Sequence, residues 1–171
     1  MMMLMMLFIG CGKQKETITS VVKQAIPITK IYSIMSDNGV YNMNSFCTDS
    51  LYSLPTENWI KTEFSTTLSL FLKSFKSSEW VTEENDCDNF SSMSYSFAQI
   101  LHHNTKNKIN NTGLCFGEFW YTKDINKVKH AINVIIVYEN DRYKVLFFEP
   151  QTQSIVELSK TEKESCEFYK F

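Results

Sequence analysis

The sequence predicts an α+β fold in which helices come first along the chain and strands follow. Apolar residues recur at three- and four-residue spacing over 56–75 and again over 87–103, which is the period of a helix with one face on a core. After residue 113 the apolar segments are instead rich in β-branched and aromatic residues, with Gly, Asn, Asp and Lys between them. This order favours N-terminal helices packed on a C-terminal antiparallel β-sheet over alternating βαβ units.

The composition is that of one folded domain. The chain has 171 residues, and its 13 Phe, 8 Tyr and 3 Trp supply more buriable area than a disordered chain carries. Its net charge of −2 creates no positive field, so we expect no nucleic acid partner. The longest apolar run, residues 1–9, is well short of the roughly 20 residues that cross a bilayer as a helix.

The first eleven residues resemble a bacterial lipoprotein signal. Leu7-Phe8-Ile9-Gly10 precede Cys11 as in a lipobox, where the Cys is lipidated and becomes the new N-terminus. This predicts a signal with anchor Cys over 1–11, a polar tether over 12–26 and the folded domain over 27–171. It places the protein at the bacterial cell envelope, in contact with the membrane through its N-terminal lipid. The alternative is a cytoplasmic protein with an apolar tail.

Between residues 27 and 55 the pattern is weak, and no strand is assigned with its bounds. Asn38-Gly39 is a turn signal that would suit a hairpin. The first strongly periodic segment follows Pro55, with Thr56 as a suitable N-cap and Glu57 at the positive end of the helix dipole. Its apolar stripe, which includes Phe64, is the pattern of core packing, so we assign it no chemistry.

The second helix is expected to begin at Cys87, capped by Asn85 or Asp86, and to end near His103. Cys87 then lies in the first turn, where backbone N–H groups are unpaired and the helix dipole is positive. Such a position lowers a thiol pKa and makes the thiolate a nucleophile. The alternative is a buried cysteine that acts as a small apolar residue.

A second candidate pair comes from the register of the expected strands. If Asn140-Asp141 is a two-residue turn, His130 and Glu149 lie on one face of adjacent strands as diagonal neighbours, roughly 5–8 Å apart. Glu149 would then accept a hydrogen bond from the imidazole and hold it ready to act as a base. A register change of one residue would separate the two side chains. The strands expected in this half of the chain are Leu114–Tyr121, His130–Tyr138, Tyr143–Glu149, Ser154–Leu158 and Cys166–Phe171.

Three short motifs contain these candidates. Asp86-Cys87-Asp88-Asn89-Phe90 resembles the Asp-Cys-Asp-x-Phe segment of bacterial transglutaminase-like cysteine peptidases. His130-Ala131-Ile132-Asn133 and Glu149-Pro150-Gln151-Thr152 are similar to the His-Ala-x-Asn and Glu-Pro-Gln signatures of the papain-like peptidase domain in the mushroom agglutinin family and its bacterial and phage relatives. The order Cys, His, Glu along the chain also fits that group, and the match covers about residues 80–152.

The resemblance implies a papain-like fold and a thiol-dependent amide hydrolase, or cysteine peptidase, that acts on a protein or peptide substrate. In this reading Cys87 is the nucleophile, His130 the general base and then acid, and Glu149 the residue that orients His130, with Gln151 as its substitute. The backbone N–H of Cys87 and the side chain of Asn85 or Asp86 are the candidate oxyanion donors. Two alternatives stay open, which are transglutaminase-type acyl transfer and a catalytically inactive lipoprotein that acts as a binding module.

No cofactor or metal is predicted from the residues themselves. The resemblance implies calcium dependence, but Asp86 and Asp88 are too few carboxylates to argue a calcium site. Cys47, Cys115 and Cys166 lack the spacing of a zinc site. His102 and His103 are expected to be solvated.

Overall fold

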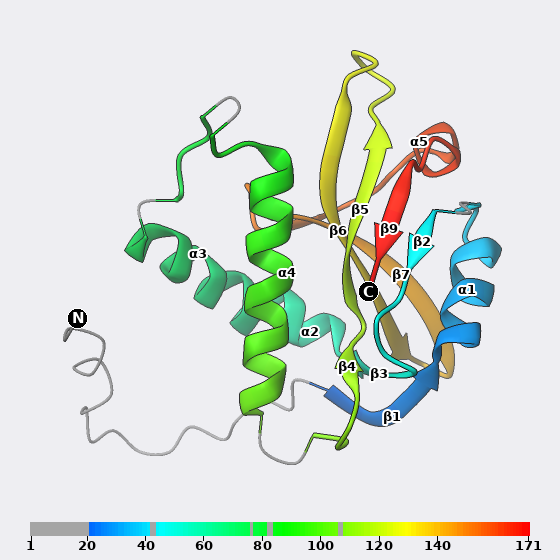
Figure 1. Ribbon diagram of the computed structural model, residues 1–171. Coiled ribbons are helices and arrows are strands. Elements are labelled where there is room, and N and C mark those ends of the chain that lie inside the picture. Colours follow the sequence, from blue (N-terminus) through cyan, green and yellow to red (C-terminus); the bar gives the residue numbers. More distant parts are fainter. Residues whose placement is uncertain (1–20, 42–43, 76, 82–83, 106–107) are drawn as a thin grey trace, which may run out of the picture.

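The computed structural model describes residues 21–41, 44–75, 77–81, 84–105 and 108–171, and Figure 1 shows the arrangement of their elements. The predicted signal and its lipidation site, Cys11, lie outside these residues. In chain order the elements are β1 (Val21–Pro27), α1 (Ile28–Asp37), β2 (Ser45–Phe46), β3 (Leu51–Pro55), α2 (Glu57–Trp59), the π-helix η1 (Ile60–Phe64), α3 (Ser65–Ser74), α4 (Cys87–Asn104), β4 (Gly113–Leu114), β5 (Phe116–Thr122), β6 (Lys129–Glu139), β7 (Arg142–Glu149), β8 (Ser154–Val156), α5 (Lys160–Glu164) and β9 (Phe168–Lys170).

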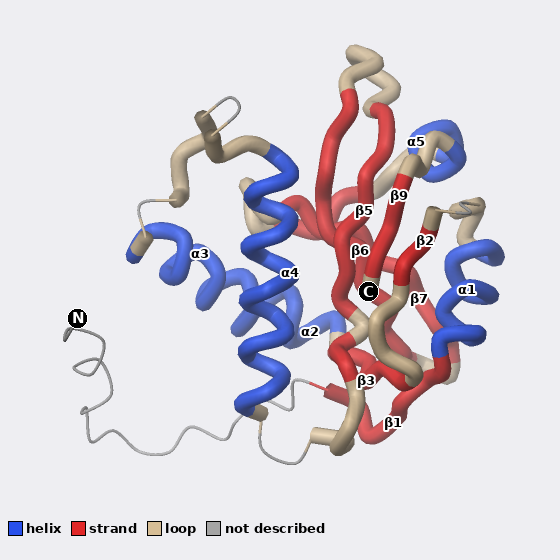
Figure 2. The backbone as a smooth tube through the Cα atoms, in the orientation of Figure 1, coloured by secondary structure: helices blue, strands red, loops and turns tan. Residues whose placement is uncertain are grey.

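The described strands form two sheets. The larger has six strands in the order β2-β9-β5-β6-β7-β8, and the smaller has the order β1-β3-β4. Most neighbouring strands are antiparallel, but β2 pairs with β9 and β3 pairs with β4 in parallel. Figure 2 shows the helices divided between the two sides of the larger sheet, with α4, α2 and α3 on one side and α1 on the other.

Strand β6 is buried on both faces, which explains its almost continuous apolar sequence. Ile135 and Val137 pack in a core with residues of α3 and α4. Val134 and Ile136 point the other way, into a core shared with α1 and the smaller sheet. The larger sheet is therefore the middle layer of a three-layered domain.

The core on the α4 side is built around Phe64, which is fully buried. Its ring centroid lies 4.9 Å from that of Phe116, 5.1 Å from Trp59, 5.5 Å from Phe148 and 6.2 Å from Phe97. Two of these rings lie in the helices α2 and α4, and the other two lie in the strands β5 and β7 of the larger sheet. One side chain therefore joins the helical layer to the sheet.

The predicted fold class is wrong in its arrangement. Strands β1, β2 and β3 all precede α4, so helices do not come first, and neither sheet is purely antiparallel. Strand β2 escaped prediction because it has two residues and its partner β9 is distant in sequence. Residues 21–26, which were predicted to belong to the tether, form most of β1.

The segment 28–39 also differs from expectation. It forms α1, with Ile31, Ile34 and Met35 on its buried face, and Asn38 is its C-cap where a hairpin turn was expected. Gly39 follows with φ of +83°, the left-handed conformation that glycine commonly supplies just after a helix.

The elements from Thr56 onward follow the prediction closely. Thr56 Oγ1 accepts a hydrogen bond from Trp59 N, as an N-cap does, and the helical run continues to Ser74 with one π-helical segment. No helix within the described ranges is long and apolar enough to cross a membrane.

Candidate functional site

Cys87 is the first residue of α4, as predicted. Asp86 is the N-cap, and its backbone N–H donates to Asn89 Oδ1 at 3.2 Å in a capping box. Cys87 is half-buried, and α4 and β6 both begin at the top of Figure 1. The helix start therefore places the sulfur beside the residues that open β6, among them His130 and Ala131.

His130 and Glu149 meet because of the register of one hairpin. Residues Asn140 and Asp141 form the turn with positive φ angles of 50° and 60°, and Glu139 pairs with Arg142 as predicted. The same register continues to the pair Asn133 and Phe148. His130 Nε2 then lies 2.7 Å from Glu149 Oε2, with the two side chains 8% and 13% exposed.

The thiol of Cys87 lies in hydrogen-bond contact with the His130 imidazole. This bond is the largest influence on the pKa of Cys87, which it lowers. Burial acts in the opposite direction, while the backbone of Ala131 and the charge of His130 lower the pKa further. The charge of Asp86 raises it, but the net shift of the Cys87 pKa is downward.

The same contacts also shift the pKa of the His130 imidazole. Burial alone would lower the pKa of His130, but hydrogen bonds to Cys87 and Glu149 and the charge of Glu149 outweigh burial and raise it. Since Nε2 bonds to Glu149, the other ring nitrogen is left for the sulfur. The shifts of the two pKa values, downward for Cys87 and upward for His130, favour transfer of the thiol proton to His130.

One residue of this site was missed in the sequence. Tyr121 is the cross-strand partner of His130, and its ring packs edge-on against the imidazole with centroids 5.8 Å apart. The signal was available, because aligning β5 with β6 as a hairpin would place these two residues opposite each other.

The supporting residues lie in different surroundings. Asn85 Nδ2 donates to Ser77 O at 3.3 Å and to Glu79 O at 2.5 Å, so both of its amide hydrogens hold the loop before α4. Asp86 caps the helix, and Gln151 N donates to Glu149 Oε1 at 3.2 Å. Gln151 Nε2 is buried without a hydrogen-bond partner in the described part of the chain, which makes it a free donor near Glu149.

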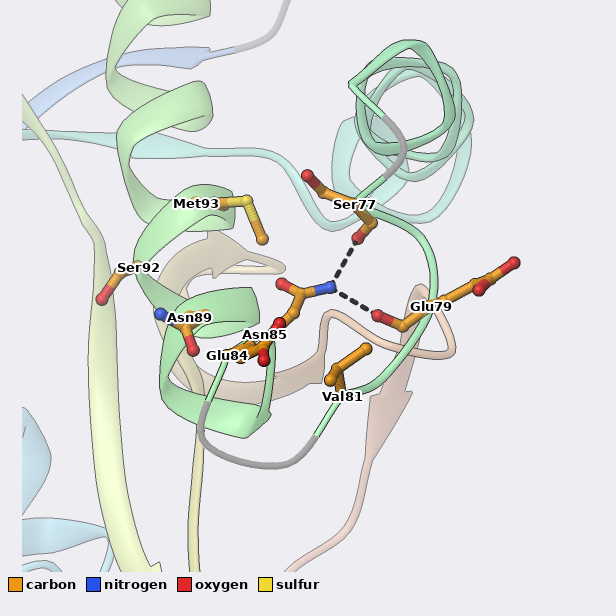
Figure 3. A pocket seen from close by; sticks show the side chains of 8 residues that line it. All are labelled: Ser77, Glu79, Val81, Glu84, Asn85, Asn89, Ser92 and Met93. Atoms are coloured by element: carbon orange, nitrogen blue, oxygen red, sulfur yellow. Dashed lines mark hydrogen bonds between the residues drawn. The ribbon is translucent and has the colours of Figure 1, made fainter.

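Asn85 also borders a polar hollow beside the start of α4, with a volume of about 480 Å³ (Figure 3). Amide, hydroxyl and carboxylate groups dominate its wall, and none of Cys87, His130 and Glu149 lines it. The lining residues are Ser77, Glu79, Val81, Glu84, Asn85, Asn89, Ser92 and Met93.

The structure also places the other cysteines and His102. Cys47, Cys87 and Cys115 are not in disulfides within the described residues, and Cys115 is fully buried. The expectation of a solvated His102 is wrong, because this side chain is 4% exposed with Nε2 3.2 Å from Thr112 O. Over the residues that the structure describes, no group of three or more His, Cys, Asp or Glu could hold a metal ion.

Comparison with known proteins identifies the fold. No family model and no curated protein matches the chain. Among solved structures, a PSL1a–E64 complex matches with a TM-score of 0.65 and 22% identity, covering 86% of this chain and 50% of that one. The Polyporus squamosus lectin bound to the human-type influenza-binding epitope Neu5Acα2-6Galβ1-4GlcNAc matches with a TM-score of 0.63 and 22% identity, covering 86% and 49%. The chain thus shares a fold with these proteins and spans about half their length.

These findings overturn the predicted identity, activity and partners. The fold neighbours are structures of a lectin, and one of them holds a glycan epitope. The assignment to papain-like cysteine peptidases, the amide hydrolase and acyl-transfer activities and the protein or peptide substrate are therefore withdrawn. The comparisons give no support to the lipoprotein, phage and membrane-anchor attributes, and the envelope location stays a prediction because Cys11 lies outside the described residues.

Proposed function

We propose that this chain is a ligand-binding module whose site contains a nucleophilic thiol, Cys87. His130 accepts the thiol proton, and Glu149 holds His130 in position. The observation that carries the proposal is the linked set of contacts, in which the Cys87 thiol meets the imidazole and the imidazole meets Glu149 at 2.7 Å. Groups that merely fill space would not combine a helix N-terminus and a buried imidazole at one sulfur with a carboxylate bonded to that imidazole.

The thiol is expected to form covalent bonds with electrophilic ligands. With a haloacetamide, the sulfur forms a bond to carbon, the carbon–iodine bond breaks and iodide leaves, while the thiol proton stays on His130. With an epoxide, the thiolate would form a sulfur–carbon bond and break a carbon–oxygen bond of the ring, and His130 would return its proton to the oxygen. One of the neighbours is a complex with E64.

We expect iodoacetamide at pH 7 to label Cys87 at least tenfold faster than Cys47 or Cys115. The pKa of the Cys47 and Cys115 thiols is raised by burial, whereas the pKa of Cys87 is lowered. Peptide mapping by mass spectrometry over a time course measures each rate, and E64 serves as a second probe. His130→Ala should slow labelling of Cys87 about tenfold or more, and His103→Ala, which removes an exposed imidazole from α4, should not. Equal labelling of all thiols in the wild type would contradict the proposal.

Carbohydrate binding is the second candidate function. It is favoured by the lectin neighbour with its sialylated epitope and by the polar hollow beside α4. Trp80, which lies between two residues of the hollow's wall, is 57% exposed. Hydroxyl-rich ligands suit a site in which convergent polar groups lie next to an aromatic face.

If the hollow is a glycan site, Trp80→Ala is expected to weaken binding of Neu5Acα2-6Galβ1-4GlcNAc about tenfold or more, because a sugar face would lose its aromatic platform. Isothermal titration calorimetry gives the dissociation constant. Trp120→Ala is the control, because Trp120 is 36% exposed, packs against Phe168 and is not among the residues that line the hollow. Absence of binding at millimolar glycan, or equal loss in the two variants, would remove this candidate.

A further inference from the structure

A buried polar network joins α4 to the middle of the larger sheet. Ser91 and Asn133 are both fully buried. Ser91 Oγ donates to Ile132 O at 2.8 Å, and Asn133 Nδ2 donates to Ser91 O at 2.9 Å and to Gly117 O at 3.0 Å. The network therefore bonds α4 directly to β6 and, through Asn133, to β5.

This network lies close to the candidate site along both elements. Ser91 follows Cys87 by one helical turn, and Asn133 follows His130 by three residues on β6. The sulfur contacts both the His130 side chain and the backbone of Ala131. Both contacts depend on where α4 lies along β6, because a shift of one residue would carry the sulfur past the imidazole.

Apolar packing alone would not fix that position. The contacts of Phe90 and Phe97 of α4 with the core are non-directional, and such contacts tolerate small shifts of a helix over a sheet. Hydrogen bonds between buried groups do not tolerate such shifts, because a shifted helix would leave several buried donors and acceptors unpaired. Polar groups are costly in a core, which makes their use at this helix–sheet contact informative.

We propose that Ser91 and Asn133 are positioning residues, which fix the register of α4 on β6 and thereby hold the Cys87 thiol against His130. The proposal rests on the nucleophilic thiol proposed above and assigns a function to two residues that do not touch a ligand.

The chain contains a matched control at the other end of α4. Gln99 Nε2 donates to Leu114 O at 3.1 Å and to Phe116 O at 3.3 Å, and Gln99 Oε1 accepts from Leu114 N at 3.1 Å. This second polar network also ties α4 to strands, but it lies three turns beyond Cys87. Loss of either network should destabilise the fold, whereas only loss of the Ser91–Asn133 network should change the thiol.

The test compares Ser91→Ala, Asn133→Leu and Gln99→Leu in two measurements. The first is the pH dependence of Cys87 alkylation, and the second is the titration of His130 followed by NMR of its ring protons. Ser91→Ala is expected to slow alkylation at pH 7 about three- to tenfold and to lower the His130 pKa. Gln99→Leu should lower the melting temperature with both readouts unchanged. Asn133→Leu should act like Ser91→Ala but more strongly, and Ser91→Ala alone decides the result if that variant does not fold.

Two results would overturn the positioning role. One is a Ser91→Ala variant whose alkylation profile and His130 titration match those of the wild type, and the other is an equal shift in Gln99→Leu. Failure of the proposed function looks different. If wild-type Cys87 is not selectively labelled, the thiol proposal fails, while the His130 titration still shows whether Ser91 maintains the contact between the ring and the sulfur.

Discussion

Phe64→Ala is expected to lower the free energy of unfolding by about 3–5 kcal/mol, the usual cost of removing a large buried aromatic side chain. Phe64 is fully buried and its ring contacts four others, from Trp59, Phe97, Phe116 and Phe148. These rings belong to a helix, a second helix and two strands of the larger sheet, so they cannot all move to fill the space. The loss therefore includes both buried apolar area and a residual cavity.

Urea unfolding followed by circular dichroism measures this loss as a shift of the midpoint at unchanged slope. Phe46→Ala is the matched control, because Phe46 is 60% exposed on the edge strand β2 and its removal should change stability by no more than about 0.5 kcal/mol. A loss below about 1 kcal/mol for Phe64→Ala would mean that the aromatic cluster does not join the helices to the sheet.

The helical period and the hairpin were predictable because both depend on residues close in sequence. The stripe that contains Phe64 and Leu68 is read from three- and four-residue spacing, and the structure buries both side chains. A two-residue turn at Asn140-Asp141 fixes a register over both flanking strands, so it brought His130 and Glu149 together in prediction and in structure.

The shortest strands, β2 and β4, were not predictable for the opposite reason. Gly113–Leu114 pairs in parallel with residues of β3 some sixty positions earlier, and two residues carry no alternation that could reveal a strand. Helix α1 did leave a signal, because Ile31, Ile34 and Met35 have helical spacing and Gly39 follows its end. The turn signal at Asn38-Gly39 concealed it, since the same dipeptide serves a hairpin and a helix end.

The contact between Cys87 and His130 was the part of the site with no local signal. Spacing places Cys87 at a helix start and His130 on a strand, but it does not say where the helix docks. In the structure that docking depends on buried groups such as Ser91 and Asn133, whose pairing becomes visible only in three dimensions. A motif therefore identified the residues, and tertiary packing decided their contact.

Glu149→Gln is expected to move the pH midpoint of Cys87 alkylation upward by about one unit, which slows the reaction at pH 7 by about tenfold. Hydrogen bonding and the charge of Glu149 raise the pKa of His130, and a neutral amide keeps at most the hydrogen bond. When the pKa of His130 falls, less of its imidazole is protonated, and its charge lowers the pKa of the Cys87 thiol less. Less thiolate is then present near neutral pH.

The same substitution has a second signature, in the pH dependence of stability. Because folding raises the pKa of His130, its protonation stabilises the native state fully below the unfolded value of about 6.5, and this contribution is lost as pH rises through the folded value. The stability difference between wild type and Glu149→Gln should therefore be larger at pH 6 than at pH 9, as urea midpoints at the two values would show.

Glu167→Gln separates this effect from a general loss of negative charge. Glu167 pairs with Lys129, the neighbour of His130 along β6, at 2.7 Å, and the Lys129 and Glu167 side chains are 76% and 39% exposed. Solvent screens such a pair, so its loss should leave the alkylation midpoint within about 0.2 units of the wild type. Equal shifts in the two variants would show that the thiol responds to net charge, whereas a shift confined to Glu149→Gln means that it responds to the one carboxylate in contact with the ring.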